Sequence, residues 1–286
     1  MDRCTATITR DRRVRLVNDV MRGAALPPEY SQLLADFPRF SADVMPHDGA
    51  AEWHLSTEAV AAGIEAGRKL FPMPEVKGDT RFQTQLWWWS MCGALVGPSL
   101  ACVMVSGRVP VWQWSSWFTF LRDDYWVGFQ AQQFESISAE DADELKDSGE
   151  ALAHFLEPLA QIVGEVGEIK PAPLWAVAAD AVANAAIAAG NELMEPWRGA
   201  LIGKHVVEGI QRVHRVPLPR FMDSCGGEVR PWDEAAAESG EEPDFDVVTH
   251  LERATCCMIY HSPDADLCVS CPKRSREERH QLWARY

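Results

Sequence analysis

The pattern of hydrophobic and polar positions along the chain predicts mostly helices. The segment from Thr57 to Phe71 follows Ser56, a good N-cap residue, and stops at Pro72, which cannot continue a helix. Further segments are predicted to be helical from their apolar content, their length and their flanking residues: 13–22, 83–95, 139–166, 173–193 and 199–214.

One segment has a pattern more typical of strands. Residues 103–117 alternate in polarity and are rich in Val, Trp and Phe, with Gly107 and Arg108 as a candidate turn. A small β-hairpin or meander is therefore expected there. The fold class that follows is α+β, predominantly helical.

The chain also divides by composition. Residues 226–246 begin with two glycines and are rich in Asp and Glu, which predicts a flexible acidic linker. The linker would separate a large N-terminal domain, residues 1–225, from a small C-terminal module, residues 247–286.

A stretch without charge, from Phe82 to Gly107, is long enough to cross a bilayer. Gly97 and Pro98 divide it into pieces of the length of core elements. A buried core segment is therefore favoured over a membrane span, while peripheral contact with a membrane stays open.

Composition and charge narrow the class of protein. The chain has 286 residues, a formal net charge of -15 and eight cysteines. Because phosphate binding needs a basic surface, nucleic acid is not an expected partner. The polar, arginine-rich start of the chain does not resemble a signal peptide, so we expect a cytoplasmic protein with reduced cysteines. The oligomeric state is not indicated.

Four cysteines near the C-terminus carry the most specific chemical signal. Cys256 and Cys257 are adjacent, and Cys268 and Cys271 form a C-x-x-C pair ten residues later. Thiolates bind zinc, copper(I) and iron–sulfur clusters. Adjacent cysteines fit the two-knuckle geometry of structural zinc poorly, whereas a two-iron cluster has an elongated shape and takes two ligands on each iron. The pattern favours the 2Fe-2S cluster and leaves zinc as the alternative.

This segment resembles the C-terminal module of the FhuF-type ferric siderophore reductases. The match is the pattern C-C-x10-C-x2-C, with Arg253 before it, Tyr260 within it and Pro272 after it; His261 stands where an arginine is usual. The resemblance covers about 25 residues. It implies that all four cysteines bind a 2Fe-2S cluster, and that Arg253, Tyr260 and His261 surround it.

The resemblance also implies an activity, the one-electron reduction of Fe(III) in a hydroxamate-type siderophore. No G-x-G-x-x-G fingerprint follows a predicted strand, so we expect no bound NAD or flavin. A ferredoxin or a flavoprotein reductase would then supply the electron. The alternatives are a zinc-binding or cluster-containing redox-sensing module without reductase activity, and a siderophore biosynthesis protein, for which a P-loop is missing.

Other residues are weaker candidates. Trp112, Trp114 and Trp117 could line a siderophore pocket, although core packing is the more common role of tryptophan. The basic residues after the last cysteine are either a solvated helix start or a docking patch for the electron donor. These are Lys273, Arg274, Arg276 and Arg279. The remaining cysteines lack ligand spacing; Cys92 and Cys102 lie in apolar surroundings typical of core thiols.

Overall fold

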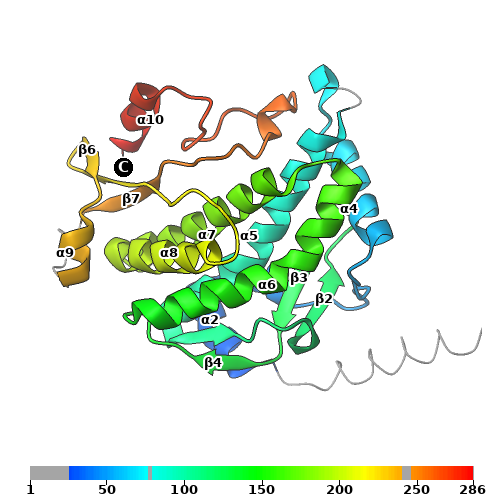
Figure 1. Ribbon diagram of the computed structural model, residues 1–286, viewed down its shortest axis with the longest axis horizontal. Helices are drawn as coiled ribbons and strands as arrows, with labels where there is room; N and C mark the ends of the chain where they lie inside the picture. The colour runs from blue at the N-terminus through cyan, green and yellow to red at the C-terminus, as the bar shows by residue number, and fades with distance from the viewer. Residues whose placement is uncertain (1–25, 77–78, 240–245, 286) are drawn as a thin grey trace, which may run out of the picture.

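The computed structural model describes residues 26–76, 79–239 and 246–285. The predicted helix at 13–22 and Cys4 lie outside these ranges. The long helices run side by side as one body, and the C-terminal segment lies along one side of it (Figure 1). The α-helices are α2 (Pro28–Asp36), α3 (Ser41–Val44), α4 (Thr57–Leu70), α5 (Thr80–Ser106), α6 (Ala142–Gly167), α7 (Pro171–Glu192), α8 (Pro196–Gln211), α9 (Glu234–Ser239) and α10 (Arg276–Trp283).

The strands form three small antiparallel sheets. Strand β1 (Arg108–Pro110) pairs with β4 (Phe134–Ser136), and β2 (Trp117–Leu121) pairs with β3 (Val127–Ala131). The third sheet has the order β6-β5-β7, from β6 (Glu228–Pro231), β5 (Phe221–Cys225) and β7 (Val248–Leu251). The fold is therefore α+β and predominantly helical, as predicted.

The predicted start and end of helix α4 are confirmed. Ser56 Oγ accepts a hydrogen bond from the backbone N–H of Ala59 at 3.1 Å, and the helix ends at Leu70, two residues before Pro72. The three helices α6, α7 and α8 also lie within a few residues of their predicted ranges. These boundaries depend on capping residues and prolines close in the sequence, which is why they could be predicted.

The prediction of a hairpin over residues 103–117 is wrong. Helix α5 continues through Pro98 to Ser106, and Gly107 ends it in a left-handed conformation with φ of 59°. Gly107 is therefore a helix C-cap residue and not the turn of a hairpin. The hairpin in this region lies further along, between β2 and β3.

Helices α5 and α7 form the centre of the fold. Helix α7 packs against α5 on one side and α8 on the other, and α8 packs against α6. By length and composition both α5 and α7 could cross a membrane, yet 72% and 67% of their most apolar windows are buried inside the protein. Burial of this extent agrees with the interpretation of residues 82–107 as a core segment.

Helices α6 and α8 touch at their glycines. A Cβ on Gly209 of α8 would lie 2.0 Å from the carbonyl oxygen of Lys146, and a Cβ on Gly149 would lie 2.0 Å from that of Val206. Even a methyl group at either position would therefore push the two helix backbones apart.

We expect Gly209→Ala to lower the free energy of unfolding by at least about 2 kcal/mol, because the helices must separate. The matched control is Gly93→Ala in α5, where a Cβ would meet nothing within 4 Å. That substitution should raise stability by about 0.5–1 kcal/mol, since alanine restricts the unfolded chain. Urea unfolding measures the free energy of unfolding of both variants. Equal changes in the two variants would contradict the close contact between α6 and α8.

The prediction of a flexible linker is wrong for residues 226–239. Gly226 and Gly227 make the turn between β5 and β6 with φ of 57° and 85°, and α9 follows. Lys204 of α8 forms ion pairs with Glu234 and Glu238 of α9, which attach that helix to the body. Residues 240–245 lie outside the described ranges. Because β5 pairs with β7, the sheet joins the predicted N-terminal domain to the C-terminal module.

Helix α10 packs on this third sheet. Trp283 is fully buried, and its ring stacks on His250 of β7 at 5.2 Å. The Nε2 atom of His250 lies 2.8 Å from Ser224 Oγ on β5. Burial lowers the pKa of His250 from 6.5 to about 4.

The fold should therefore lose stability in acid through His250. Because its pKa is lowered in the folded state, its contribution is present above pH 6.5 and is lost as the pH falls towards 4. We expect this loss to be about 1–2 kcal/mol, since the ring is partly screened by solvent. Urea unfolding at about pH 7 and about pH 4.5 should show a weaker pH dependence in His250→Gln. His54→Gln, at an exposed histidine, is the control. The same pH dependence of stability in wild type, His250→Gln and His54→Gln would contradict the assignment of the effect to His250.

Candidate iron–sulfur site

The four cysteines of the predicted metal site lie in two turns between β7 and α10. Cys256 and Cys257 follow β7, while Cys268 and Cys271 share a turn in which the N–H of Cys271 donates to the carbonyl of Cys268 at 3.1 Å. Cys256, Cys257 and Cys271 are buried, the last with 2% of its surface exposed, and Cys268 is exposed. The site therefore has an inner side against the helices and an outer edge at the surface.

The cysteine sulfurs are close enough to change each other's ionisation. A hydrogen bond from Cys256 lowers the pKa of Cys257 to about 5, with help from the N–H of Ile259 and the charge of Arg253. The same bond, together with burial, raises the pKa of Cys256. Burial raises the pKa of Cys268, and charge on Cys257 or Cys271 raises it further. Because thiolates are the metal-binding form, the shared hydrogen bond and the charge of Arg253 favour one thiolate in the Cys256–Cys257 pair.

The arrangement of the sulfurs differs from a site for one ion. Among the residues that the structure describes, no three Cys, His, Asp or Glu side chains are placed to hold a single metal ion. A 2Fe-2S cluster instead distributes its four ligands over two irons. The adjacent Cys256 and Cys257 fit this ligand set better than the two-knuckle geometry of a tetrahedral zinc site.

Backbone N–H groups point at two of the sulfurs. The N–H of Met258 donates to Cys256 Sγ at 3.4 Å, and the N–H of Ile259 donates to Cys257. Met258 has φ of 67°, a left-handed conformation that turns the chain sharply after the cysteine pair. Hydrogen bonds of this kind stabilise thiolate ligands and raise the reduction potential of iron–sulfur centres.

Arg253 lies between Trp89 of α5 and Cys268 and has hydrogen-bond donors without a partner in the described ranges. Its guanidinium sits 3.7 Å from the centre of the Trp89 ring on α5, and its Nη1 donates to Cys268 Sγ at 3.6 Å. The side chain is buried, and its Nε and Nη2 atoms have no hydrogen-bond partner within the described ranges. Unpaired buried donors are costly, and the sulfur atoms of a bound cluster would accept from them. The residues present therefore fit a 2Fe-2S cluster.

Side chains of α5 and α7 hold the turn that contains Cys256 and Cys257 through hydrogen bonds to its backbone. Asp180 of α7 accepts hydrogen bonds from the N–H groups of Ala254 and Thr255, at 3.1 and 2.6 Å, and from the Thr255 hydroxyl at 2.5 Å. Gln85 of α5 donates to the carbonyl of Cys256 at 2.6 Å. Burial raises the pKa of Asp180 and the three hydrogen bonds oppose that shift. Sequence reasoning missed Asp180; its signal was a carboxylate in the middle of an alanine-rich, apolar helix.

The other two predicted neighbours of the cluster contact different groups. The rings of Tyr260 and His261 are 4.1 Å apart, and His261 packs edge-on against Phe82 of α5 at 4.8 Å. His261 Nδ1 lies 3.9 Å from Glu75. His261 therefore attaches the cysteine segment to α5 and Tyr260 packs on His261, whereas Arg253 contacts a cysteine sulfur directly.

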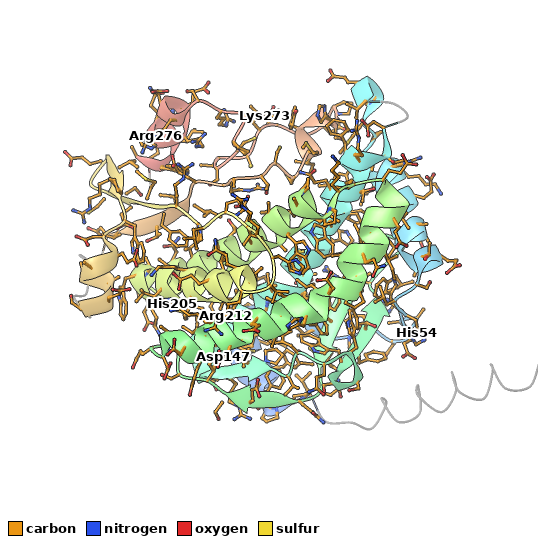
Figure 2. The ribbon with its side chains drawn as sticks, in the orientation of Figure 1. His54, Asp147, His205, Arg212, Lys273 and Arg276 are labelled. Carbon is orange, nitrogen blue, oxygen red and sulfur yellow. The ribbon has the colours of Figure 1, made fainter. Side chains whose placement is uncertain are left out.

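The basic residues after the last cysteine have separate roles. Arg274 donates through Nε to the carbonyl of Cys268 at 3.1 Å and through Nη2 to that of Leu267 at 2.7 Å, so it supports the second cysteine turn. Lys273 and Arg276 lie at the surface of the C-terminal segment (Figure 2). Docking of an electron donor on this surface stays a prediction.

The three tryptophans predicted as substrate contacts pack in the core. Trp112 stacks on Trp117 at 5.4 Å, and Trp114 stacks on Phe155 of α6 at 4.4 Å. Each indole N–H has an acceptor: Ser148 Oγ for Trp112, the Phe155 carbonyl for Trp114 and the Val111 carbonyl for Trp117. These contacts are those of core side chains, and a part in substrate binding stays a prediction.

The other cysteines in the described ranges do not belong to the site. Cys92 and Cys102 are buried in α5, and burial raises the pKa of both thiols, that of Cys102 to about 12. They are inert core thiols, as predicted. Cys225 lies at the end of β5 and is partly exposed.

Comparison with known proteins supports the assignment of the cysteine segment. Residues 253–273 match the family described as FhuF 2Fe-2S C-terminal domain. No curated protein and no solved structure matches the chain. The match spans Arg253 and all four cysteines, so it covers the residues that the structure brings together. The C-terminal segment of this chain is thus similar to the 2Fe-2S domain of FhuF-type proteins, which confirms the resemblance seen in the cysteine pattern.

Proposed function

We propose that this protein is a cytoplasmic ferric siderophore reductase that passes one electron to Fe(III) held by a hydroxamate-type chelate. The observation that carries the proposal is the FhuF-like cysteine segment. Three of its four cysteines are buried, and the fourth, Cys268, is exposed at the surface. Burial protects the ligands from water, while the open edge brings the centre within reach of a substrate.

The chemistry follows from the preferences of iron for its ligands. Cys256, Cys257, Cys268 and Cys271 would hold a 2Fe-2S cluster, which would supply one electron at a time at low potential. The chelated Fe(III) gains that electron and becomes Fe(II), and the hydroxamate oxygens hold Fe(II) far less tightly. Iron then leaves the chelate. An external ferredoxin or flavoprotein reductase returns the protein to its reduced state.

The residues of this chain contribute position and charge. Arg253 places a buried positive charge beside Cys268 and Cys257, which favours the reduced, more negative state of the site. Asp180 and Gln85 hold the first cysteine turn against α7 and α5. Little rearrangement is then needed when an electron arrives or leaves.

The experiment combines metal analysis with a ferrous trap. Protein purified without oxygen should contain iron and acid-labile sulfide and, once reduced, should release Fe(II) from at least one ferric hydroxamate to a ferrous chelator. Colourless protein that binds zinc without sulfide would overturn the proposal in favour of a structural or redox-sensing module. If the protein contains the cluster but releases no Fe(II) from any ferric chelate, the proposal that ferric chelates are its substrate would be overturned.

A further inference from the structure

A pocket with a volume of about 450 Å³ opens beside the cysteine segment, between α8, the β5–β6 hairpin and α10. We call it the Glu252 pocket, after the buried carboxylate at its base. Its charged lining residues are Lys204, Arg220, Glu234, Glu252, Arg276 and Arg279. The pocket is large enough for an organic chelate, because ligand pockets are typically about 300–1,000 Å³.

The Glu252 pocket has an excess of positive charge. Glu252 is only 7% exposed, and the guanidinium groups of three arginines lie close to it. The distances are 3.7 Å for Arg220, 3.5 Å for Arg276 and 3.3 Å for Arg279. One carboxylate cannot balance three guanidinium groups. The surplus is notable in a chain whose formal net charge is -15.

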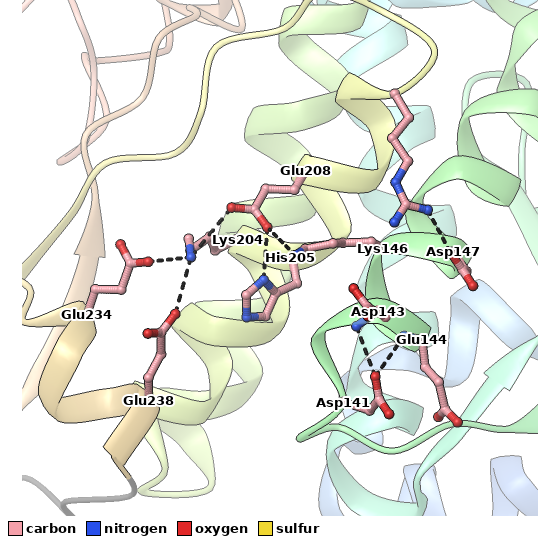
Figure 3. A network of polar contacts seen from close by, with 11 residues as sticks. Asp141, Asp143, Glu144, Lys146, Asp147, Lys204, His205, Glu208, Glu234 and Glu238 are labelled. Atoms are coloured by element: carbon pink, nitrogen blue, oxygen red, sulfur yellow. Dashed lines mark hydrogen bonds and ion pairs between the residues drawn. The ribbon is translucent and has the colours of Figure 1, made fainter.

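The opposite end of the pocket adds no unmatched positive charge. Lys204 forms an ion pair with Glu234, and beyond the pocket it also pairs with Glu208 and Glu238 (Figure 3). Lys204 is thus already matched by carboxylates. The unmatched charge of the pocket therefore belongs to its arginines.

These arginines keep free donors for a ligand. The side chains of Arg220 and Arg276 are 77% and 60% exposed, so most of their five N–H donors face solvent. Arg279 donates through Nη1 to the carbonyl of Arg274 and through Nη2 to Glu252, so the accessible free donors are those of Arg220 and Arg276. Guanidinium groups bind carboxylates through paired, charge-assisted hydrogen bonds. The free donors suit a ligand that carries carboxylates.

The pocket is directly connected to the cysteine site. Glu252 precedes Arg253, whose Nη1 donates to Cys268 Sγ. On the other side, Arg279 donates to the carbonyl of Arg274 at 2.8 Å, and Arg274 donates to the carbonyl of Cys268. Glu252 and Cys256 are four residues apart, so their Cα atoms are separated by at most about 14 Å. The pocket therefore adjoins the cysteine site both along the chain and through hydrogen bonds.

We propose that the Glu252 pocket binds the ferric chelate through free carboxylates on the chelate, so that the preferred substrate is an anionic hydroxamate chelate rather than a neutral one. The inference rests on the proposed reductase function and specifies its substrate class. Trp232, Phe221 and Leu218 also line the pocket and offer apolar surface to the organic part of the chelate. The local positive charge would attract an anionic ligand to a protein that otherwise repels it.

The test measures binding separately from reduction, with gallium complexes that cannot be reduced by the cluster. The anionic probe is the Ga(III) complex of a citrate-centred dihydroxamate whose two arms each end in an amino-acid carboxylate; these stay free, because the citrate hydroxyl and carboxylate complete the coordination of the metal. The neutral probe is Ga(III) tris(acetohydroxamate). Each is titrated calorimetrically into the complete, cluster-loaded protein. The variants are Arg220→Gln, Arg276→Gln and their combination. The control is Arg212→Gln, which removes a guanidinium paired with Asp147 and Glu150 on the helical body (Figure 2).

We expect each pocket substitution to weaken binding of the anionic complex about tenfold, since each removes a charge-assisted hydrogen bond. The neutral complex should bind weakly and equally to all variants, and Arg212→Gln should match wild type. Cluster content and the visible spectrum should not change, because Arg220 and Arg276 are exposed. Gallium binding is also independent of donor docking, in which Arg276 could take part.

The possible failures are distinguishable. Equal binding of the anionic complex by wild type and the double variant would overturn the pocket assignment, and the reductase proposal would stand if Fe(II) is still released. If wild type binds the neutral complex more tightly than the anionic one, the proposed substrate class is overturned, and the reductase proposal again stands if Fe(II) is still released. If the arginines bind the anionic complex but no ferric chelate is reduced, the pocket assignment is supported and the reductase proposal fails.

Discussion

Replacing Cys271 with serine is expected to remove the cluster and the reductase activity together. Cys271 is the most buried of the four cysteines, and its N–H and carbonyl both form hydrogen bonds in the turn that leads to α10. Serine keeps the size of the side chain but lacks the soft thiolate that iron–sulfur clusters need. Changes to groups around a metal ligand already cost about 10–100-fold in affinity, so loss of a ligand should cost more than about 100-fold.

Iron and acid-labile sulfide analysis, with the visible absorption spectrum, measures this effect. The matched control is Cys225→Ser, a partly exposed cysteine on β5 that lies outside the ligand set. Cys225→Ser should retain wild-type iron, sulfide and activity. Full cluster content in Cys271→Ser would contradict the ligand assignment, as would equal losses in the two variants.

The second large effect is expected at Asp180, which lies in a helix 76 residues before the first cysteine. Asp180→Ala removes the acceptor of two backbone N–H groups, those of Ala254 and Thr255. Each unpaired buried donor costs about 1–3 kcal/mol, so the cysteine turn should be destabilised by about 2–5 kcal/mol. We expect the cluster to be lost much faster from this variant, although the helices remain folded.

The measurement is the half-life of the visible absorption in the presence of an iron chelator. Asp180→Asn should give an intermediate half-life, because its amide oxygen can accept from one N–H while its NH2 group faces the other donor. Asp147→Ala, in which an exposed carboxylate is removed from α6, is the control and should match wild type. A wild-type half-life in Asp180→Ala would show that α7 does not hold the cysteine turn.

The features that could be predicted from the sequence are local ones. The start of α4 at Ser56 depends on residues within one turn of helix, and the cysteine pattern occupies 16 consecutive residues from Cys256 to Cys271. Helix α5 was harder, because Gly97 and Pro98 normally interrupt a helix. Here the helix is buried on several sides and continues through them to Gly107. Tertiary packing therefore outweighed the local preference.

The features that could not be predicted join distant parts of the chain. Asp180 contacts Thr255, 75 residues away, and Glu252 lies close to arginines from α10 and to Arg220, the residue before β5. Nothing in the spacing of these residues indicates that they meet. The same holds for the third sheet, in which β5 pairs with β7 across the segment that was interpreted as a linker. Only the folded chain places the support of the cysteine site and the adjacent pocket together.

The central claim is that an electron passes from the cysteine site to chelated Fe(III), and one stopped-flow measurement tests it most directly. Reduced, cluster-loaded protein is mixed without oxygen with a ferric hydroxamate in the presence of a ferrous trap, and the cluster spectrum and the trapped Fe(II) are recorded together. The account predicts that one Fe(II) is released for each cluster oxidised, with the two signals rising at the same rate. Cluster oxidation without Fe(II) release, or Fe(II) release at the same rate from Cys271→Ser, would contradict it.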